Sequence, residues 1–405
     1  MKNLKIMLFV GPAAGIVNHT IALAKVLQNM GYIPLIVTAP SVRKHIEMLN
    51  IDCQIDIIYS PSHEINFNKL DADRIPHLQQ ICSYNNLINC INAELELFVQ
   101  HNPYICITKH HYSIAVSAPK YGIPYITFYT DGAEYLIDNR NPQSVSSTPD
   151  LINNYHKAFA NFFDGKKEGR NIRHIVDVIR SPNANIIRGV PCLSSLSDEE
   201  KQNLPKNCMF GGILTYDGES TESDEINDVL FRFKTNDKII YVTFGTLCYD
   251  FTRYLKIMEY ARNLPFIFVI STMHFSIPQS YEVPKNVFLF KYIPNHLILK
   301  HCYLIIHHGG HGTALSSFLY GVPQIVIPDN IKSSAQAIHA EKIEKLGVGI
   351  NLSNTDFNYK NLANLLKTEQ VAEWKIKAQK LLDQIMHEEK LCNQNINQML
   401  SSVTK

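Results

Sequence analysis

Short, continuously apolar runs alternate with helix-patterned segments along almost the whole chain, and this alternation constrains the fold more than any other feature. An apolar run at 6–10 is followed by a helical pattern at 19–30 and by a second apolar run at 33–38. Strands that are apolar throughout are typical of parallel sheets covered by helices on both faces. The same order recurs at 104–129 and, after a break, from 238 to 327. The pattern therefore predicts an α/β chain with two doubly wound, Rossmann-like domains.

The break in the alternation predicts a domain boundary. Residues 193–236 collect turn formers and acidic residues, a composition that favours a linker between compact domains. We expect an N-terminal domain at 1–215, a linker at 216–236 and a C-terminal domain at 237–370. The last segment, 371–405, has helical periodicity and is expected to pack across both domains. Open parallel sheets bind ligands at the carboxyl ends of their strands, so two facing domains predict a ligand cleft between them.

Charge and cysteine content argue against several functional classes. The 405 residues carry 38 Lys and Arg against 37 Asp and Glu, so the basic surface of a nucleic-acid-binding protein is not expected. The nine cysteines are scattered without a C-x-x-C pair, which argues against a disulfide framework or a structural zinc site and favours a reducing cytoplasm. No apolar run reaches the roughly 20 residues of a membrane-spanning helix. The start of the chain resembles a signal peptide, but residues 5–10 also fit a buried strand, and we expect a cytoplasmic location.

The most specific segment is His307-His308-Gly309-Gly310-His311-Gly312-Thr313, which ends an apolar strand and opens a helix. The glycines permit a tight turn and a close approach of a ligand, and the helix offers free N–H groups and the positive end of its dipole. His308 and the Thr313 hydroxyl would donate hydrogen bonds to the same oxygens. The segment therefore predicts a diphosphate site. A plain strand-to-helix connection is one alternative, and a zinc site of His307, His308 and His311 is another, although the glycines interrupt their helical spacing.

Together with Gly245-Thr246 and Tyr292-Ile293-Pro294, this segment resembles the nucleotide-sugar-dependent glycosyltransferases of the macrolide, antibiotic and UDP-glycosyltransferase family. The resemblance extends over nearly the whole chain and is strongest from 241 to 352. It implies the GT-B fold, in which two Rossmann-like domains face a cleft. It also implies a base-binding role for Tyr292 and Ile293, and a diphosphate-binding role for Thr246, His308, Gly309, Gly310, Gly312 and Thr313. The donor is a co-substrate, and no metal or other cofactor is implied.

Three positions depart from the family pattern on the donor side. Many UDP-sugar enzymes carry a Glu for the ribose hydroxyls where this chain has Ser316, and an Asp-Gln pair for the sugar hydroxyls where it has Lys332 and Ser333. A thymidine nucleotide lacks the 2′-hydroxyl, and a site built to bond hydroxyls discriminates against a sugar without them. These residues therefore favour dTDP over UDP and a deoxysugar over glucose. Lys332 also fits an ordinary solvated lysine.

The catalytic histidine of the family is missing from this chain. The family loop Gly-His-Val-Asn-Pro reads Gly15-Ile16-Val17-Asn18-His19 here, and isoleucine cannot take the proton that an attacking alcohol must lose. The usual aspartate partner is also missing from Thr108-Lys109-His110-His111. Asp131, His110 and His19 are candidate substitute bases, and each also fits an ordinary turn, helix-cap or structural role. A phenol or a nucleophilic aromatic carbon as acceptor would need less help from a base.

These features favour a metal-independent, inverting glycosyltransferase of the hexosyltransferase type. It would move a sugar from a nucleoside diphosphate to a small, largely apolar natural product, the acceptor class being implied by the resemblance alone. The missing base, Asp-Gln pair and Glu favour one alternative, a glycosyltransferase-fold protein that binds a partner or serves a pathway without transferring sugar. A second alternative is a sugar-nucleotide epimerase or hydrolase, which would consume donor without an acceptor. The acceptor, the O-, N- or C-linkage, and a homo-oligomeric state or auxiliary partner protein stay open.

Overall fold

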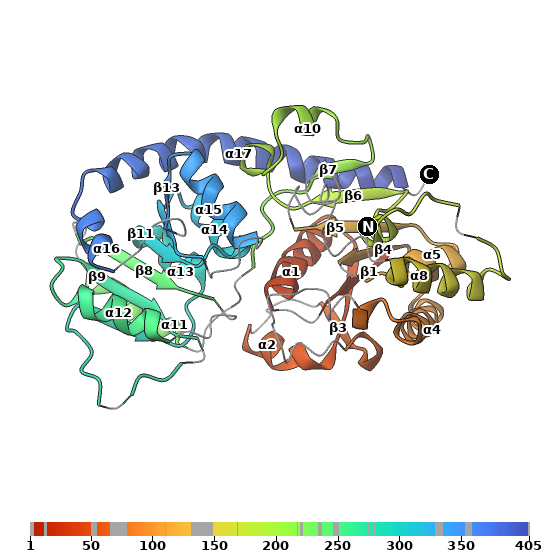
Figure 1. Cartoon of the computed structure of the whole chain (residues 1–405), viewed down its shortest axis with the longest axis horizontal. Coiled ribbons are helices and arrows are strands. Elements are labelled where there is room, and N and C mark those ends of the chain that lie inside the picture. The colour runs from red at the N-terminus through yellow and green to blue at the C-terminus, as the bar shows by residue number, and fades with distance from the viewer. Residues whose placement is uncertain are drawn as a thin grey trace. The chain divides into compact units, whose positions relative to one another are not determined.

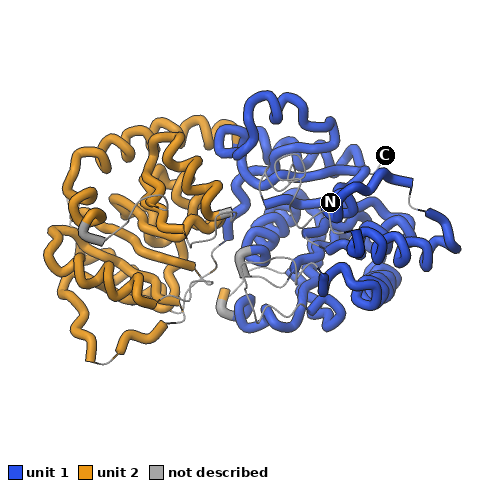
Figure 2. The backbone as a smooth tube through the Cα atoms, viewed as in Figure 1, with its two compact units in different colours: residues 1–47, 51–216, 389–405 blue, residues 48–50, 217–388 orange. Residues whose placement is uncertain are grey.

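The computed structural model describes residues 4–11, 14–49, 55–64, 79–109, 111–130, 149–167, 169–216, 218, 222–233, 237–245, 251–273, 275–278, 280–328, 335–352 and 359–403. The chain divides into two compact units (Figure 2). Unit 1 comprises residues 1–47, 51–216 and 389–405, and unit 2 comprises residues 48–50 and 217–388. Among the described helices, none combines the length and the apolar character that crossing a bilayer requires.

Unit 1 is built on a seven-stranded sheet of order β3-β2-β1-β4-β5-β6-β7, in which every neighbouring pair is parallel (Figure 1). The strands are β1 (Lys5–Val10), β2 (Ile33–Thr38), β3 (Asp56–Tyr59), β4 (Ile105–Lys109), β5 (Tyr125–Tyr129), β6 (Ala184–Ile187) and β7 (Cys208–Phe210). The chain leaves β1 toward one edge of the sheet and β4 toward the other. The carboxyl ends of β1 and β4 therefore form the topological switch point, where such sheets bind ligands.

The helices of unit 1 cover the sheet through apolar stripes. Those within the described residues are α1 (Ala14–Asn29), α2 (Arg43–Met48), α4 (Tyr84–His101), α5 (Ile114–Tyr121), α8 (Pro149–Phe162), α9 (Ile175–Ile179) and α10 (Asp198–Gln202), with short 3₁₀ turns at Pro40–Val42, Pro61–His63 and Pro191–Leu193. Helices α4, α5 and α8 pack against one another (Figure 1). The buried stripe of α4 contains Leu87, Ile91 and Phe98, and it also contains Glu94.

Unit 2 is built on a six-stranded parallel sheet of order β10-β9-β8-β11-β12-β13. The strands are β8 (Ile239–Thr243), β9 (Ile267–Ser271), β10 (Val287–Phe290), β11 (Cys302–His307), β12 (Gln324–Val326) and β13 (Gly349–Asn351). The helices are α11 (Ser223–Phe231), α12 (Thr252–Ala261), α13 (Asn295–Ile298), α14 (His311–Leu319), α15 (Ala335–Lys345) and α16 (Tyr359–Leu366), and a 3₁₀ turn spans Leu299–His301. Two apolar clusters pack around this sheet, and its switch point lies between β8 and β11.

The predicted fold class is confirmed, because both sheets are parallel and each has helices in its strand connections. Helix α1 begins at Ala14 instead of His19, because Val17 is also buried and extends the apolar stripe toward the N-terminus. The segment predicted as a linker contains α11, whose Ile226 and Leu230 are part of the core of unit 2.

The C-terminal segment forms one long helix, α17 (Gln370–Val403). Near its start Val371 and Trp374 pack in the core of unit 2, whereas residues from Glu389 onward belong to unit 1. The cysteines that the structure describes are all free thiols.

Candidate functional site

The carboxyl ends of β8 and β11 bring His308 between two glycines. The two strands are neighbours, with Thr243 paired with His307, so the residues that follow them meet at the switch point of unit 2. A Cβ atom on Gly245 would lie 2.6 Å from Cε1 of His308, and a Cβ atom on Gly310 would lie 2.6 Å from its Nε2. Both positions therefore have to be glycine for the imidazole to occupy this place. Gly309 has a φ of +90°, a backbone conformation that side chains other than glycine's rarely tolerate.

His307 fixes the glycine turn from inside the sheet. Its Nδ1 accepts the N–H of Gly309 at 3.1 Å, so the ring proton is on Nε2, which donates to Oε1 of Gln324 at 2.9 Å. The amide of Gln324 in turn donates to the Ala314 carbonyl in α14. Burial, with a smaller effect of the neighbouring His308, lowers the pKa of His307 to about 3. His307 is therefore neutral, and both of its ring nitrogens are occupied, which argues against the zinc alternative.

Helix α14 begins directly after this turn. Gly310 is its N-cap residue, and no side chain caps the first turn. A Cβ atom on Gly312 would meet no described atom within 4 Å, so there is open space beside the helix start. Free N–H groups and the positive end of the helix dipole are the features that bind phosphate oxygens. The sequence-predicted residues His308, Gly309, Gly310, Gly312 and Thr313 thus belong to one turn and one helix start.

Ser316 lies on the buried side of α14. Its exposed fraction is 2%, and its Oγ has no hydrogen-bond partner among the described residues. A direct contact between this hydroxyl and a ribose would require the helix to shift. The relevant feature of this position is that serine, unlike glutamate, offers no carboxylate to a ribose hydroxyl. Thr246, Lys332, Ser333, Asp131 and His110 lie outside the described residues.

The turn after β10 is held by a glutamate that the sequence analysis missed. One carboxylate oxygen of Glu222, the N-cap residue of α11, accepts the N–H of Lys291 at 3.0 Å and that of Tyr292 at 3.2 Å. The Tyr241 hydroxyl donates to the carbonyl of buried Ile293. Hydrogen bonds to an ionised acceptor are stronger than neutral ones. Glu222 therefore positions the turn that carries Tyr292 and Ile293, although no local sequence pattern links residue 222 to residues 291 and 292.

In unit 1, the side chain of His19 is hydrogen-bonded to an arginine. It is 2% exposed, and its Nδ1 lies 3.2 Å from a guanidinium nitrogen of buried Arg188, while its ring packs on Phe128. Guanidinium groups only donate, so Nδ1 accepts and the ring proton is on Nε2. His19 then has no ring lone pair available for a substrate proton, which argues against its predicted role as a base. Ile16 is half-buried on the same helix.

A family model describes the C-terminal part of the chain. Residues 257–400 match the model of the erythromycin biosynthesis protein CIII-like C-terminal domain. Over 92 residues the chain is 35% identical to aclacinomycin-T 2-deoxy-L-fucose transferase of Streptomyces galilaeus, a match that covers 22% of this chain and 20% of that protein. The chain therefore matches about a fifth of the length of this curated relative.

Solved structures resemble the whole chain. The calicheamicin glycosyltransferase CalG4 superposes with a TM-score of 0.74 at 15% identity and covers 100% of both chains. The glycosyltransferase VinC, solved in complex with dTDP, superposes with a TM-score of 0.70 at 17% identity and covers 99% of both chains. At these identities the likeness demonstrates the fold, which is the GT-B fold of such glycosyltransferases.

Proposed function

We propose that this chain, which carries the EryCIII-like C-terminal domain of the macrolide glycosyltransferases on a GT-B fold, transfers a sugar from a nucleoside diphosphate to a small natural product. The observation that carries the proposal is the imidazole of His308 held between Gly245 and Gly310 at the start of α14. Two backbones can approach that ring only because both residues lack a side chain. Such a turn is suited to an anionic ligand.

The donor diphosphate would bind at the first turn of α14. Negative charge develops on the diphosphate as the bond to the anomeric carbon breaks, and preorganised N–H groups stabilise it best where water is excluded. His308 and Thr313 would add side-chain hydrogen bonds, and Thr246 would contribute from the loop after β8. The helix terminus and His308 would take the place of a cation, so the proposed transfer needs no metal at the diphosphate.

The nucleoside would bind at the turn held by Glu222, with Tyr292 stacking on the base. We infer a preference for dTDP because Ser316 supplies no carboxylate for a 2′-hydroxyl, and because Lys332 and Ser333 replace the pair that bonds sugar hydroxyls in the family. A deoxysugar is the matching donor. VinC, which shares the fold, was solved with dTDP, in agreement with this choice.

The acceptor would lose its proton to a group of unit 1 or would be acidic enough to need little help. Asp131 and His110 follow the carboxyl ends of β5 and β4 and remain the proposed bases. His19 is a poor candidate because its Nδ1 accepts from Arg188. The displacement would be in line, which inverts the anomeric centre. We place the protein in the cytoplasm and its acceptors among small, largely apolar natural products.

An assay of nucleotide release tests the proposal. The purified protein is incubated with a dTDP-deoxysugar or with UDP-glucose, each with and without a panel of phenolic and macrolide acceptors. We expect release of dTDP that depends on the acceptor, with UDP-glucose used at least tenfold less efficiently. Release of dTDP without any acceptor would indicate a hydrolase. More efficient use of UDP-glucose than of the dTDP-deoxysugar would contradict the donor assignment.

A second function has one observation in its favour. The family base position is Ile16, and Nδ1 of the nearby His19 accepts from Arg188, so neither of these two side chains of α1 is placed to take a proton from an alcohol. A chain that binds nucleotide without transferring sugar would serve as a partner of another enzyme. The same assay separates the two functions, because this second protein would bind dTDP and release none from a sugar donor with any acceptor.

A further inference from the structure

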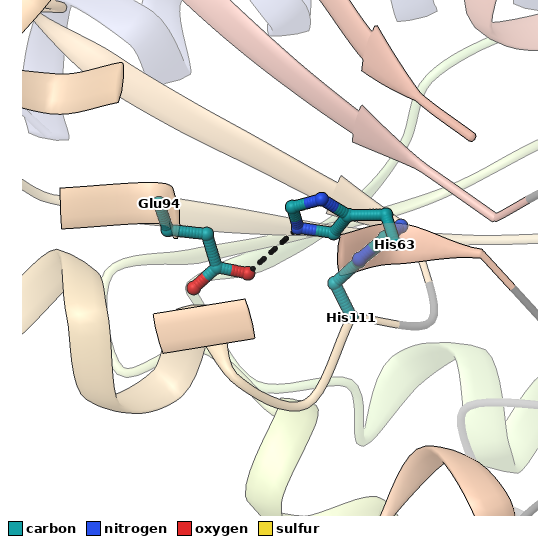
Figure 3. A group of neighbouring side chains, drawn as sticks. All are labelled: His63, Glu94 and His111. Carbon is teal, nitrogen blue, oxygen red and sulfur yellow. Dashed lines mark hydrogen bonds and ion pairs between the residues drawn. The ribbon is translucent and has the colours of Figure 1, made fainter. Parts of the chain in front are cut away.

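Unit 1 contains a buried cluster of two histidines and one glutamate that the proposed transfer does not use (Figure 3). His63 ends the 3₁₀ turn after β3, Glu94 lies in the middle of α4, and His111 follows β4. Their exposed fractions are 2%, 0% and 6%. One potential ligand atom of each lies within 4.8 Å of those of the other two. Three segments far apart in the sequence thus converge on one point.

The side chains of His63 and Glu94 are joined by a hydrogen bond and lie at a separation from which both could bind one ion. Nε2 of His63 lies 3.2 Å from Oε1 of Glu94. A hydrogen bond between an imidazolium and a carboxylate is expected at about 2.7–2.9 Å. Two ligands of one tetrahedral Zn²⁺ ion lie about 3.4 Å apart, given metal–ligand distances of about 2.1 Å. The observed 3.2 Å is an ordinary hydrogen-bond distance, and the two atoms would have to separate by only about 0.2 Å to share an ion.

The surroundings of the cluster orient each donor atom. Nδ1 of His63 lies 2.8 Å from Oγ of Ser60, which fixes the ring and leaves Nε2 directed at Glu94. The hydroxyls of Ser113 and Ser117 donate to the two oxygens of Glu94 at 2.5 Å each. Metal sites in proteins have such an outer shell, in which the second nitrogen of each histidine and the carboxylate are themselves hydrogen-bonded.

An aromatic side chain packs against both histidines of the cluster. The His63 and His111 rings are 4.8 Å apart, and Phe9 of β1 packs on both. The donor set of the cluster is two imidazoles and one carboxylate, which suits Zn²⁺ among the abundant divalent ions.

We propose that His63, Glu94 and His111 form a Zn²⁺ site. The ion would join the 3₁₀ turn after β3, helix α4 and the segment after β4, next to the switch point of the sheet. Its role would be to hold these segments in place, since the three ligands are buried in unit 1 and the proposed diphosphate site is in unit 2. The positive charge of the ion would also compensate the carboxylate of Glu94, which is expensive to bury alone.

Competition with a chromophoric chelator tests the site in the full chain. The protein is stripped of metal by dialysis against a chelator and titrated with ZnCl₂. We expect one tight site per chain in the wild type, with its affinity reduced more than about 100-fold in Glu94→Gln and His111→Gln, because the loss of an outer-shell partner alone costs about 10- to 100-fold. Ser117→Ala should cost about tenfold. The exposed His387 provides the matched control, and His387→Gln should bind zinc as tightly as the wild type.

Stability measurements guard against variants that fail to fold. Zinc should raise the melting temperature of the metal-free wild type and of His387→Gln, and should leave that of metal-free Glu94→Gln unchanged. Replacement of zinc by Co²⁺ should give the visible absorption of a tetrahedral nitrogen and oxygen site in the wild type and in His387→Gln, but not in Glu94→Gln or His111→Gln. Equal zinc affinity in the wild type, Glu94→Gln and His111→Gln would overturn the proposal, as would a wild type without a tight site. None of these readouts depends on sugar transfer.

Discussion

The switch points of the two sheets differ in how closely their residues match the pattern expected of a glycosyltransferase. In unit 2 the carboxyl ends of β8 and β11 form a turn in which Gly245, His308 and Gly310 are fitted to one another at contact distance. In unit 1 the helix after β1 has Ile16 where the family has its base, and His19 accepts a hydrogen bond from Arg188. The turn in unit 2 tolerates few substitutions, because two backbone segments pack directly against the ring of His308. A proton-accepting group can be lost or moved when the acceptor itself is acidic.

The largest loss of activity is expected from a substitution at the switch point of unit 2. His308→Ala removes the side chain that both glycines accommodate and should lower kcat/KM for transfer about 10²- to 10³-fold, as the loss of one charge-stabilising donor does elsewhere. His296→Ala, on the exposed side of α13, is the matched control and should be neutral. Steady-state kinetics measure both. Equal rates in the two variants would contradict a role for His308 in holding the donor.

The neutral His307 makes the stability of unit 2 depend on pH. Its folded pKa of about 3 lies below the ordinary value of 6.5, so between these values the unfolded chain binds a proton that the folded chain does not. The contribution is fully present above pH 6.5 and is lost as the pH falls toward 3. Each pH unit in that window should cost about 1.4 kcal/mol, so the free energy of unfolding should drop by on the order of 2 kcal/mol from pH 6.5 to 5.

Urea unfolding at several pH values checks this expectation with His307→Gln as the comparison. Glutamine cannot take up the proton, so the variant should be less stable at pH 7 and should lose less stability on acidification. Parallel slopes for the wild type and the variant between pH 6.5 and 5 would show that His307 titrates normally, and would remove the argument that it is locked in the neutral form.

Glu222 tests the base-binding side of the same unit. Glu222→Ala removes the carboxylate that accepts the N–H groups of Lys291 and Tyr292, and dTDP should bind about tenfold more weakly, which corresponds to about 1.4 kcal/mol. Inorganic pyrophosphate should bind as before, because it has no base. Calorimetry with both ligands makes the test, and Glu225→Ala, exposed on the same helix, is the control. A loss that is equal for both ligands would mean that Glu222 acts on the whole unit.

The smallest effect is expected at His19. Because its Nδ1 accepts from Arg188, His19→Gln offers an amide oxygen in a similar place and should change kcat by no more than about threefold, with the same pH profile. A general base contributes about 10²- to 10⁴-fold. A fall in that range, with loss of the acidic limb of the pH profile, would restore His19 as the base and would remove the contrast between the two switch points.

The parts of the molecule that follow from local pattern were predictable from the sequence. Continuous apolar runs indicated the central strands of both sheets, and the glycines around His308 indicated the turn before α14. Contacts between distant segments were not predictable. The carboxylate of Glu222 meets backbone N–H groups about seventy residues away. Helix α11 looked like a linker because it follows turn-forming residues and begins with acidic and polar ones.

The cluster of His63, Glu94 and His111 in unit 1 was also not predictable from the sequence. Glu94 shares the helical spacing of Leu87, Ile91 and Phe98, and an acidic residue on an apolar stripe is a signal that could have been read. Its histidine partners come from 31 residues before it and 17 residues after it, in segments without a metal-binding spacing. Only the packing of α4 against the neighbouring turns brings them together.

The central claim is that the donor diphosphate binds at the start of α14 beside His308. The most direct measurement is calorimetric titration of the purified protein with dTDP, UDP and GDP, repeated with His308→Ala. The account predicts one dTDP per chain with micromolar affinity, weaker binding of UDP and GDP, and loss of the dTDP signal in the variant. An absence of heat with all three nucleotides, or dTDP affinity that His308→Ala leaves unchanged, would contradict it.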